Sequence, residues 1–179
     1  MLWRLLLIMC VSLLPAAFML VPSAPQPRSA NATAAVDAKL KDLGYISEDG
    51  VTQSIDSDTS EIKAWQNGDV VRVIQTSHKV TFQFTLIETN EEVLKLFYAD
   101  TTANGSLVRM TGAQSPHQTF VLDVLDGKKV LRIVIPDGQV TERGEVTYKN
   151  GEAVGYQVTV TAYPDSQGVK AYKHLGTKL

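Results

Sequence analysis

Two apolar segments flank a turn in Phe120-Val-Leu-Asp-Val-Leu-Asp-Gly-Lys-Lys-Val-Leu-Arg-Ile-Val-Ile135. Both segments are rich in the β-branched and aromatic residues that favour strands. Between them stands Asp126-Gly127, a pair favoured by the type I′ turns that join the strands of a hairpin. We therefore expect an antiparallel β-hairpin over 120–135, whose second strand ends at Pro136-Asp-Gly138.

Two further segments, 80–87 and 156–163, alternate with the two-residue period of a half-buried strand. The apolar set is Val80, Phe82, Phe84 and Leu86 in the first segment and Tyr156, Val158, Val160 and Ala162 in the second. Residues 70–74 form a separate β-branched run. Short strands separated by turns predict an antiparallel β-sandwich or a partly closed barrel.

Residues 89–99 have a helical pattern instead. Thr89-Asn-Glu-Glu92 fits a capping box, in which the Thr89 hydroxyl accepts from the Glu92 amide and the Glu92 side chain bonds back. An apolar stretch of about two to three turns follows. The predicted fold is thus mainly β, with one flanking α-helix at about 89–99 and an apolar N-terminal segment before it.

The first 35 residues differ in composition from the rest of the chain. They hold two bases and no acid, and the run from Leu5 to Val21 is almost entirely apolar. Ala30-Asn31-Ala32 matches the small-residue cleavage site of a secretory signal. A signal peptide, a membrane anchor and a chain start outside the folded protein all fit. We expect two parts: a leader-like segment with a Pro/Ala-rich linker, residues 1–35, and a β domain, residues 36–179.

Composition excludes several classes of protein. The chain has 179 residues with 17 basic and 19 acidic side chains, so its formal net charge of −2 argues against a polybasic nucleic-acid binder. The single cysteine, Cys10, excludes an intramolecular disulfide and a CxxC zinc site.

The sequence shows no catalytic motif. His78, His117 and His174 have no partners at metal-ligand spacing, and H-E-x-x-H, G-x-S-x-G and P-loop patterns do not occur. We therefore expect no enzyme activity, no catalytic or cofactor-binding residue, no metal site and no cofactor.

Four blocks of sequence occur in order along the chain. They are Leu43-Gly-Tyr-Ile-Ser-Glu-Asp-Gly-Val51, Ile62-Lys-Ala-Trp-Gln-Asn-Gly-Asp-Val-Val-Arg72, Thr81-Phe-Gln-Phe-Thr-Leu-Ile-Glu-Thr-Asn90 and Val158-Thr-Val-Thr-Ala-Tyr-Pro-Asp165. Together they resemble the major tail tube proteins of long-tailed bacteriophages, especially those of actinobacterial hosts and their prophages, over roughly 33–176. The resemblance implies a β-sandwich or barrel subunit with one flanking helix, assembled in hexameric rings that stack into a conduit for the genome.

The resemblance also implies a location and partners. The subunit would assemble with itself in the host cytoplasm, become part of the virion, and meet a tape measure and a tail terminator, with DNA only in transit. Proteins of this kind usually begin with a polar or β-forming arm and are not exported. An apolar leader departs from that pattern, which favours a misassigned start, an upstream frame change or a degenerate prophage copy over a working signal peptide.

Two strand faces are polar yet uncharged, and we expect one or both to line the lumen of such a tube. The face residues are Thr81, Gln83 and Thr85 in one strand and Gln157, Thr159 and Thr161 in the other. Basic side chains bind phosphates, so a conduit for DNA should present neutral or acidic groups instead.

Residues 48–68 have weak strand character, and we expect a long loop that orders on contact with the adjacent ring. Asp56-x-Asp58-x-Ser60 opens like a calcium loop, but Glu61 stands where an EF-hand needs glycine, so a solvated acidic loop is the better interpretation. The candidate contact residues are Asp49, Asp56, Asp58, Glu61 and Trp65.

The alternative function comes from a different class. An exported bacterial β-sandwich binding protein, secreted by way of an N-terminal signal peptide, fits the leader but not the four blocks.

Overall fold

The computed structural model describes residues 17–22, 32 and 40–177. Over these residues the chain is mainly β, with a single α-helix. The elements are β1 (Ala17–Pro22), β2 (Lys41–Asp42), β3 (Ile46–Lys63), β4 (Val70–Leu86), α1 (Glu91–Tyr98), β5 (Gln118–Asp126), β6 (Lys129–Arg143), β7 (Tyr156–Tyr163) and β8 (Tyr172–Thr177).

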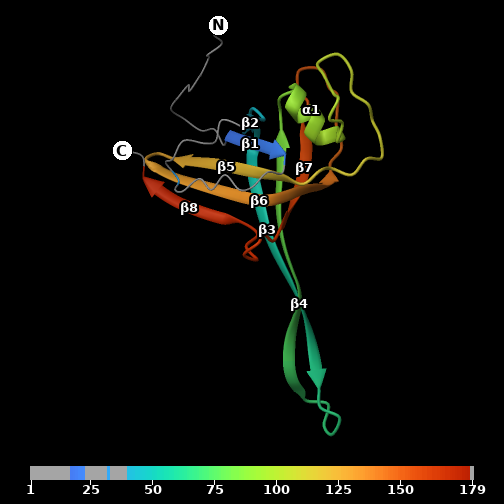
Figure 1. The fold of residues 1–179 in the computed structure, drawn as a ribbon, viewed down its shortest axis with the longest axis vertical. Coiled ribbons are helices and arrows are strands. Elements are labelled where there is room, and N and C mark those ends of the chain that lie inside the picture. Colours follow the sequence, from blue (N-terminus) through green and yellow to red (C-terminus); the bar gives the residue numbers. More distant parts are fainter. Residues whose placement is uncertain (1–16, 23–31, 33–39, 178–179) are drawn as a thin grey trace.

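All the strands belong to one antiparallel sheet that does not close into a barrel, with the order β2-β1-β5-β6-β7-β4-β3. Strand β6 joins its two halves: residues 129–134 pair with β8, and residues 137–143 pair with β7. Figure 1 shows the consequence, because β5, β6 and β8 run across the view while β3, β4 and β7 run along its long axis. The sheet is therefore strongly bent, as a sandwich-like fold requires.

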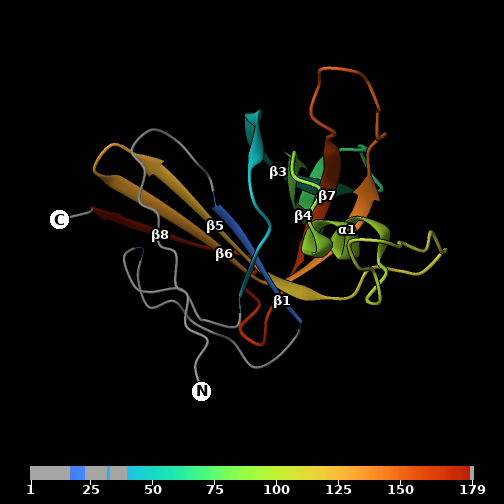
Figure 2. The ribbon, with the colours of Figure 1, turned by 90° about the horizontal axis from the view of Figure 1, so that it is seen from above.

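The core lies inside this bend. The apolar positions predicted for the two alternating strands are all buried, and they pack with side chains of β5 and β6 such as Phe120 and Ile135. One edge of the core is covered by α1, through Val93, Leu96 and Phe97. Figure 2 shows α1 beside β4 and β7, with β5, β6 and β8 extending away from them. The described residues contain no helix with the length and apolar character that crossing a bilayer requires.

The predicted helix forms, but its cap is one residue later than expected. Asn90, not Thr89, is the N-cap, and its Oδ1 accepts from the Val93 amide at 2.8 Å. Asparagine is as good an N-cap as serine or threonine. The Thr89 hydroxyl instead lies 3.3 Å from the Tyr156 hydroxyl, so the predicted capping box is wrong.

The hairpin over 120–135 forms with different details. Asp126 pairs with Lys129, so the loop consists of Gly127-Lys128, and only Gly127 has a positive φ, of 58°. Positive φ at the first central residue alone fits a type II′ turn rather than the predicted type I′.

The sequence predicted that the second strand of the hairpin ends at Pro136-Asp-Gly138, and the structure contradicts this prediction. Proline cannot donate to a ladder, and here it lies where β6 changes partners, between Val134 paired with β8 and Asp137 paired with β7. Strand β6 therefore continues to Arg143.

The prediction of a long loop over 48–68 is wrong. Residues 46–63 are strand β3, paired along nearly its whole length with β4, which unites the two predicted runs at 70–74 and 80–87. Asp49, Asp56, Asp58 and Glu61 consequently lie on β3, and Trp65 lies in the turn between the strands. Strand β3 contains Asp, Glu and Gly residues that are depleted in strands, so its strand state depends on pairing with β4 rather than on local propensity.

Part of the leader-like segment 1–35 forms regular structure. Residues 17–22 are β1, which pairs with β5 from Ala17↔Asp123 to Pro22↔Gln118 and with β2 on its other side. Ala32 is buried, whereas Ala30 and Asn31 of the predicted cleavage site lie outside the described residues.

Candidate functional site

The six neutral side chains predicted to line a lumen lie on adjacent strands. The cross-strand pairs are Thr81↔Thr161, Gln83↔Thr159 and Thr85↔Gln157. Because alternate side chains point to opposite sides of a strand, these residues share one side of the sheet, and the core phenylalanines of β4 occupy the other. We call this surface the polar face.

The polar face extends over two more strands. Thr52 and Ser54 of β3 lie in register with Gln83 and Thr81. On β6, the Thr141 hydroxyl lies 2.9 Å from that of Thr161. Sequence reasoning missed these additions, because β3 alternates weakly and the β6 strand was expected to end before residue 139.

The polar face is covered along its β6 border and is open at Gln83 and Gln157. Gln139 Nε2 donates to the Ser115 carbonyl at 2.7 Å, and Arg143 Nη2 donates to the Ser115 hydroxyl at 2.6 Å. Thr161, next to this border, is only 7% exposed. Gln83 and Gln157 are exposed, so a partner or a ligand would meet amides and hydroxyls there.

Few charges accompany the polar face. Glu142 lies in register with Thr159 at its β6 border. At its β3 border Asp56 is paired across the ladder with Lys79. Arg143, the next residue after Glu142 along β6, adds a base at the β6 border. The centre of the face is therefore electrically neutral, with an acid and a base at its β6 border and one opposite-charge pair at its β3 border.

Residues 55–79 form a long hairpin that projects from the body, and we call it the arm (Figure 1). Every side chain in it is exposed except the half-buried Ala64 of its turn. That turn is closed by the Ala64 amide donating to the Asp69 carbonyl at 2.8 Å. Backbone pairing thus holds the arm in shape without a core of its own.

The arm is unusually apolar for a solvent-exposed hairpin. Its exposed large apolar residues are Ile55, Ile62, Trp65, Val70, Val71, Val73 and Ile74. Trp65, at the tip, is 97% exposed. Exposed apolar patches of this kind mark interaction sites in soluble proteins.

The predicted contact residues are divided between several surfaces. Asp56 and Asp58 follow Thr52 and Ser54 at two-residue spacing, so they continue the polar face along β3. Glu61 points to the opposite side of the strand. Asp49 lies in the irregular segment between the pairs Ile46↔Leu86 and Val51↔Phe84.

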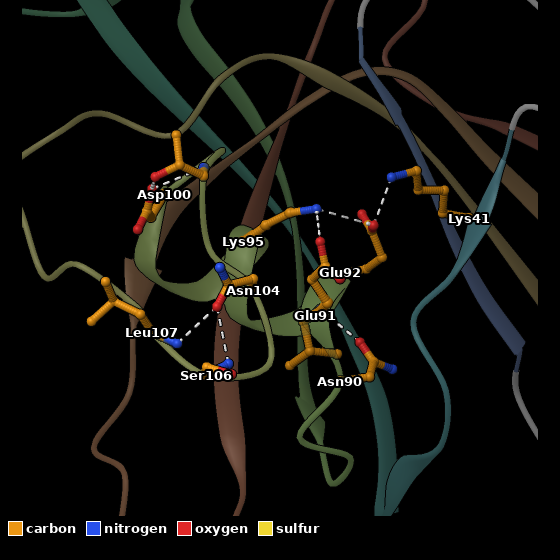
Figure 3. A network of polar contacts seen from close by, with 11 residues as sticks. Lys41, Asn90, Glu91, Glu92, Lys95, Asp100, Asn104, Ser106 and Leu107 are labelled. Carbon is orange, nitrogen blue, oxygen red and sulfur yellow. Dashed lines mark hydrogen bonds and ion pairs between the residues drawn. The ribbon is translucent and has the colours of Figure 1, made fainter.

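A polar network supports the helix and the loop after it (Figure 3). Glu92 lies 2.6 Å from Lys41 of β2, and Lys95 contacts both Glu91 and Glu92. The hydrogen bond from Lys95 lowers the pKa of Glu91 and raises that of Lys95. These ion pairs join β2 to α1 and have a structural role.

Asp100 organises the loop that follows α1. Its Oδ1 accepts from the amide and the hydroxyl of Thr102, at 2.9 and 2.6 Å, and its Oδ2 accepts from the Arg109 amide at 2.9 Å. The Thr102 hydroxyl, followed by the Arg109 amide, lowers the pKa of the Asp100 carboxyl. Over residues 17–22, 32 and 40–177, no group of three or more His, Cys, Asp or Glu side chains is placed to hold a metal ion.

These features define a class of protein, namely an antiparallel β protein with an exposed neutral face and an exposed apolar arm. A family model described as phage tail tube protein matches residues 17–178. This chain therefore belongs to the phage tail tube protein family, which confirms the predicted resemblance. Its role is structural, as a component of a virion tail that assembles with other tail components.

Similar solved structures include the cryo-EM structure of the anti-feeding prophage cap, described as a tube terminating cap. Sequence identity is 8% and the TM-score is 0.49, with 89% of this chain and 88% of that chain covered. Comparison with curated proteins gives no match.

Proposed function

We propose that copies of this chain form closed rings, hexameric as the family resemblance implies, that stack into the tail tube through which DNA passes. The observation that carries the proposal is the polar face, which gathers the six predicted Thr and Gln residues on β4 and β7. Heterologous contacts close into rings when their rotation closes, and the rings can then stack.

The polar face suits the wall of a DNA channel. Fixed lysines and arginines would bind phosphates and hold the polyanion in place. The amides and hydroxyls of Gln83, Gln157 and Thr159 carry no net charge, and Glu142 at the border repels phosphate. DNA would therefore slide past this wall with little retention.

The arm supplies contacts between rings. Its exposed apolar side chains lie outside the buried core, and an adjacent ring would bury them. Asp56 and Asp58 continue the polar face, so this side of the arm would border the channel. Trp65, at the tip, would be buried against the neighbour.

The remaining partners follow from the role of a tube subunit. A tape measure would occupy the lumen before DNA does, and a tail terminator would end the stack, with assembly in the host cytoplasm. The subunit itself catalyses nothing and holds no cofactor or metal.

Lysines on the polar face test the proposal. We expect tubes assembled from the Gln83→Lys, Gln157→Lys chain to retain linear DNA in a salt-sensitive way. The same tubes should not retain closed circular DNA, because it has no end that can enter the channel. Gln167→Lys is the matched control, because Gln167 is exposed in the loop between β7 and β8 and is not one of the residues of this face. Equal retention of linear and circular DNA by the Gln83→Lys, Gln157→Lys tubes would place the polar face outside the channel and refute the assignment.

A further inference from the structure

A second apolar surface lies at the far end of β5, β6 and β8, beyond the core. Val124, Leu131 and Leu175 are aligned across these three strands. Val124 lies two residues after the core residue Leu122, so both side chains are on the inner side of the sheet. Leu131 lies in register with Val124, and Leu175 with Leu131, so they share that side. The inner side of the sheet therefore continues past the core into the open.

These residues line a groove of about 620 Å³, which we call the β8 groove. Leu175 is 84% exposed and Val124 is 36% exposed. The charged residues that line the groove, Asp126 and Lys129, are one acid and one base, and both are exposed to water. Exposed apolar surface of this kind marks a place where another segment or molecule binds. The groove therefore suits an apolar occupant that carries no charge of its own.

The chain enters the fold beside this groove. Strand β1 begins at Ala17, which pairs with Asp123 of β5. Because the two strands are antiparallel, β1 followed backwards runs toward the end of β5, where Val124 is the next residue. Figure 1 shows β1 lying along β5, with its first residue toward the end of the sheet that forms the groove. The residues before β1 are therefore joined to the fold within one residue of the groove.

The nine residues before β1 match the groove in chemistry. Residues 8–16 read Ile-Met-Cys-Val-Ser-Leu-Leu-Pro-Ala, with no charged side chain and a single hydroxyl, that of Ser12. The nearest base, Arg4, precedes this stretch, so its guanidinium can stay in water. An uncharged apolar stretch can cover Val124 and Leu175 without burying a charge of either sign.

The same stretch is long enough to cross the groove. Nine extended residues span at most about 30 Å, whereas the three strands of the groove, spaced by about 4.8 Å, lie within about 10 Å of one another. A segment joined by so short a connection has an effective concentration on the order of millimolar. The chain's own residues 8–16 are therefore favoured over an equally apolar segment of another copy.

We propose that residues 8–16 pack into the β8 groove of their own molecule and cover Val124 and Leu175. The inference does not depend on the proposed function. It gives a structural role to a stretch whose composition also fits a signal peptide. Cleavage at the predicted site Ala30-Asn31-Ala32 would remove both this stretch and β1, so the folded subunit keeps its amino-terminal residues.

The chain's only cysteine, Cys10, lies within residues 8–16 and makes a direct test possible. The full-length Leu175→Cys chain is treated with a short bis-maleimide in dilute solution, and the products are mapped by mass spectrometry. We expect a within-chain cross-link from Cys10 whose yield does not change on further dilution. Met110→Cys is the matched control, because Met110 is 76% exposed and does not line the groove. Its within-chain yield should be at least about tenfold lower, because only a bound segment is held at high local concentration.

A charge in the groove gives a second readout. Leu175→Asp should raise the rate at which a maleimide modifies Cys10 several-fold, because an apolar stretch packs poorly against a carboxylate that loses its water. The circular dichroism spectrum should stay unchanged, since the Leu175 side chain is exposed. Leu107→Asp, at another exposed leucine, should leave the modification rate of Cys10 as in the wild type.

Three results would overturn the inference. A within-chain yield no greater than that of Met110→Cys would show that residues 8–16 lie elsewhere. A cross-link that forms only between chains, and increases with concentration, would place another copy in the groove. An unchanged modification rate of Cys10 in Leu175→Asp would show that the groove does not hold this stretch. Each of these results leaves the proposed function standing, since DNA retention by tubes tests that function separately.

Discussion

Gly138 lies in β6 where the strand crosses the centre of the core. A Cβ at this position would lie 2.7 Å from the Phe120 ring and 3.0 Å from a methyl carbon of Val160. Phe120 and Val160 are fully buried, so neither can move aside easily. The close approach of the backbone to these side chains is what requires glycine here.

We expect Gly138→Ala to lower the free energy of unfolding by about 1–3 kcal/mol, the usual cost of overpacking a core. Urea unfolding of the monomer measures it. Gly112→Ala is the control, since nothing lies within 4 Å of a Cβ there. An equal effect of the two substitutions would contradict the packing described for Gly138.

Asp100 makes stability depend on pH. Its pKa is lowered in the folded state, so its stabilising contribution is present above the unfolded-state pKa and is lost as pH falls through the folded-state value. We expect the difference in unfolding free energy between the wild type and Asp100→Asn to be largest near neutral pH and to shrink in acid. Chemical denaturation at a series of pH values measures it, and a difference that grows on acidification would show the opposite linkage.

At the scale of elements, helix α1 depends on its N-cap. Removing the Asn90 side chain leaves the Val93 amide without its acceptor and breaks a 3.2 Å hydrogen bond from Asn90 Nδ2 to the Leu43 carbonyl. Asn90→Ala should therefore cost about 1 kcal/mol of stability. Thermal unfolding of both variants measures this loss of stability, and Thr89→Ala should lose less stability than Asn90→Ala. A larger loss of stability from Thr89→Ala would favour the capping box predicted from the sequence.

The arm is the element that we propose makes contacts with other subunits. Val71→Glu, Val73→Glu places two charges at side chains that are 68% and 56% exposed, so the monomer should fold normally. Tube formation should be lost, because burying those charges at an interface costs several kcal/mol. Leu107→Glu, Met110→Glu is the control outside the arm. Normal tubes from the arm variant, measured by sedimentation, would remove the arm from the assembly contacts.

Local pattern predicted some elements well and others poorly. The alternation in 80–87 and 156–163 identified buried positions correctly, because one side of each strand faces the core. Strand β3 was missed because it carries Asp and Glu residues that are depleted in strands, and its strand state depends on pairing with β4. Likewise, the two Thr/Gln faces could be recognised singly, but their union on one surface depends on a register between strands about 75 residues apart along the chain.

At the scale of the whole molecule, the described surfaces of one copy are incomplete. The arm exposes apolar side chains that another copy would cover, whereas Val124 and Leu175 at the far end of the sheet expose apolar side chains that we propose residues 8–16 cover. Among the described strands, both β3 and β8 also lack a partner on one edge. The predicted division of the chain into residues 1–35 and residues 36–179 stays a proposal. Strand β1 joins the folded unit, because it pairs with β5. Association would therefore complete the packing that a single chain leaves open.

Cryo-EM of tubes assembled from the full chain tests the central claim most directly. The account predicts rings whose inner wall carries Gln83, Gln157 and Thr159, with each arm reaching a neighbouring subunit. A map that places these three residues on the outer wall, or ordered assemblies without a continuous channel, would contradict it.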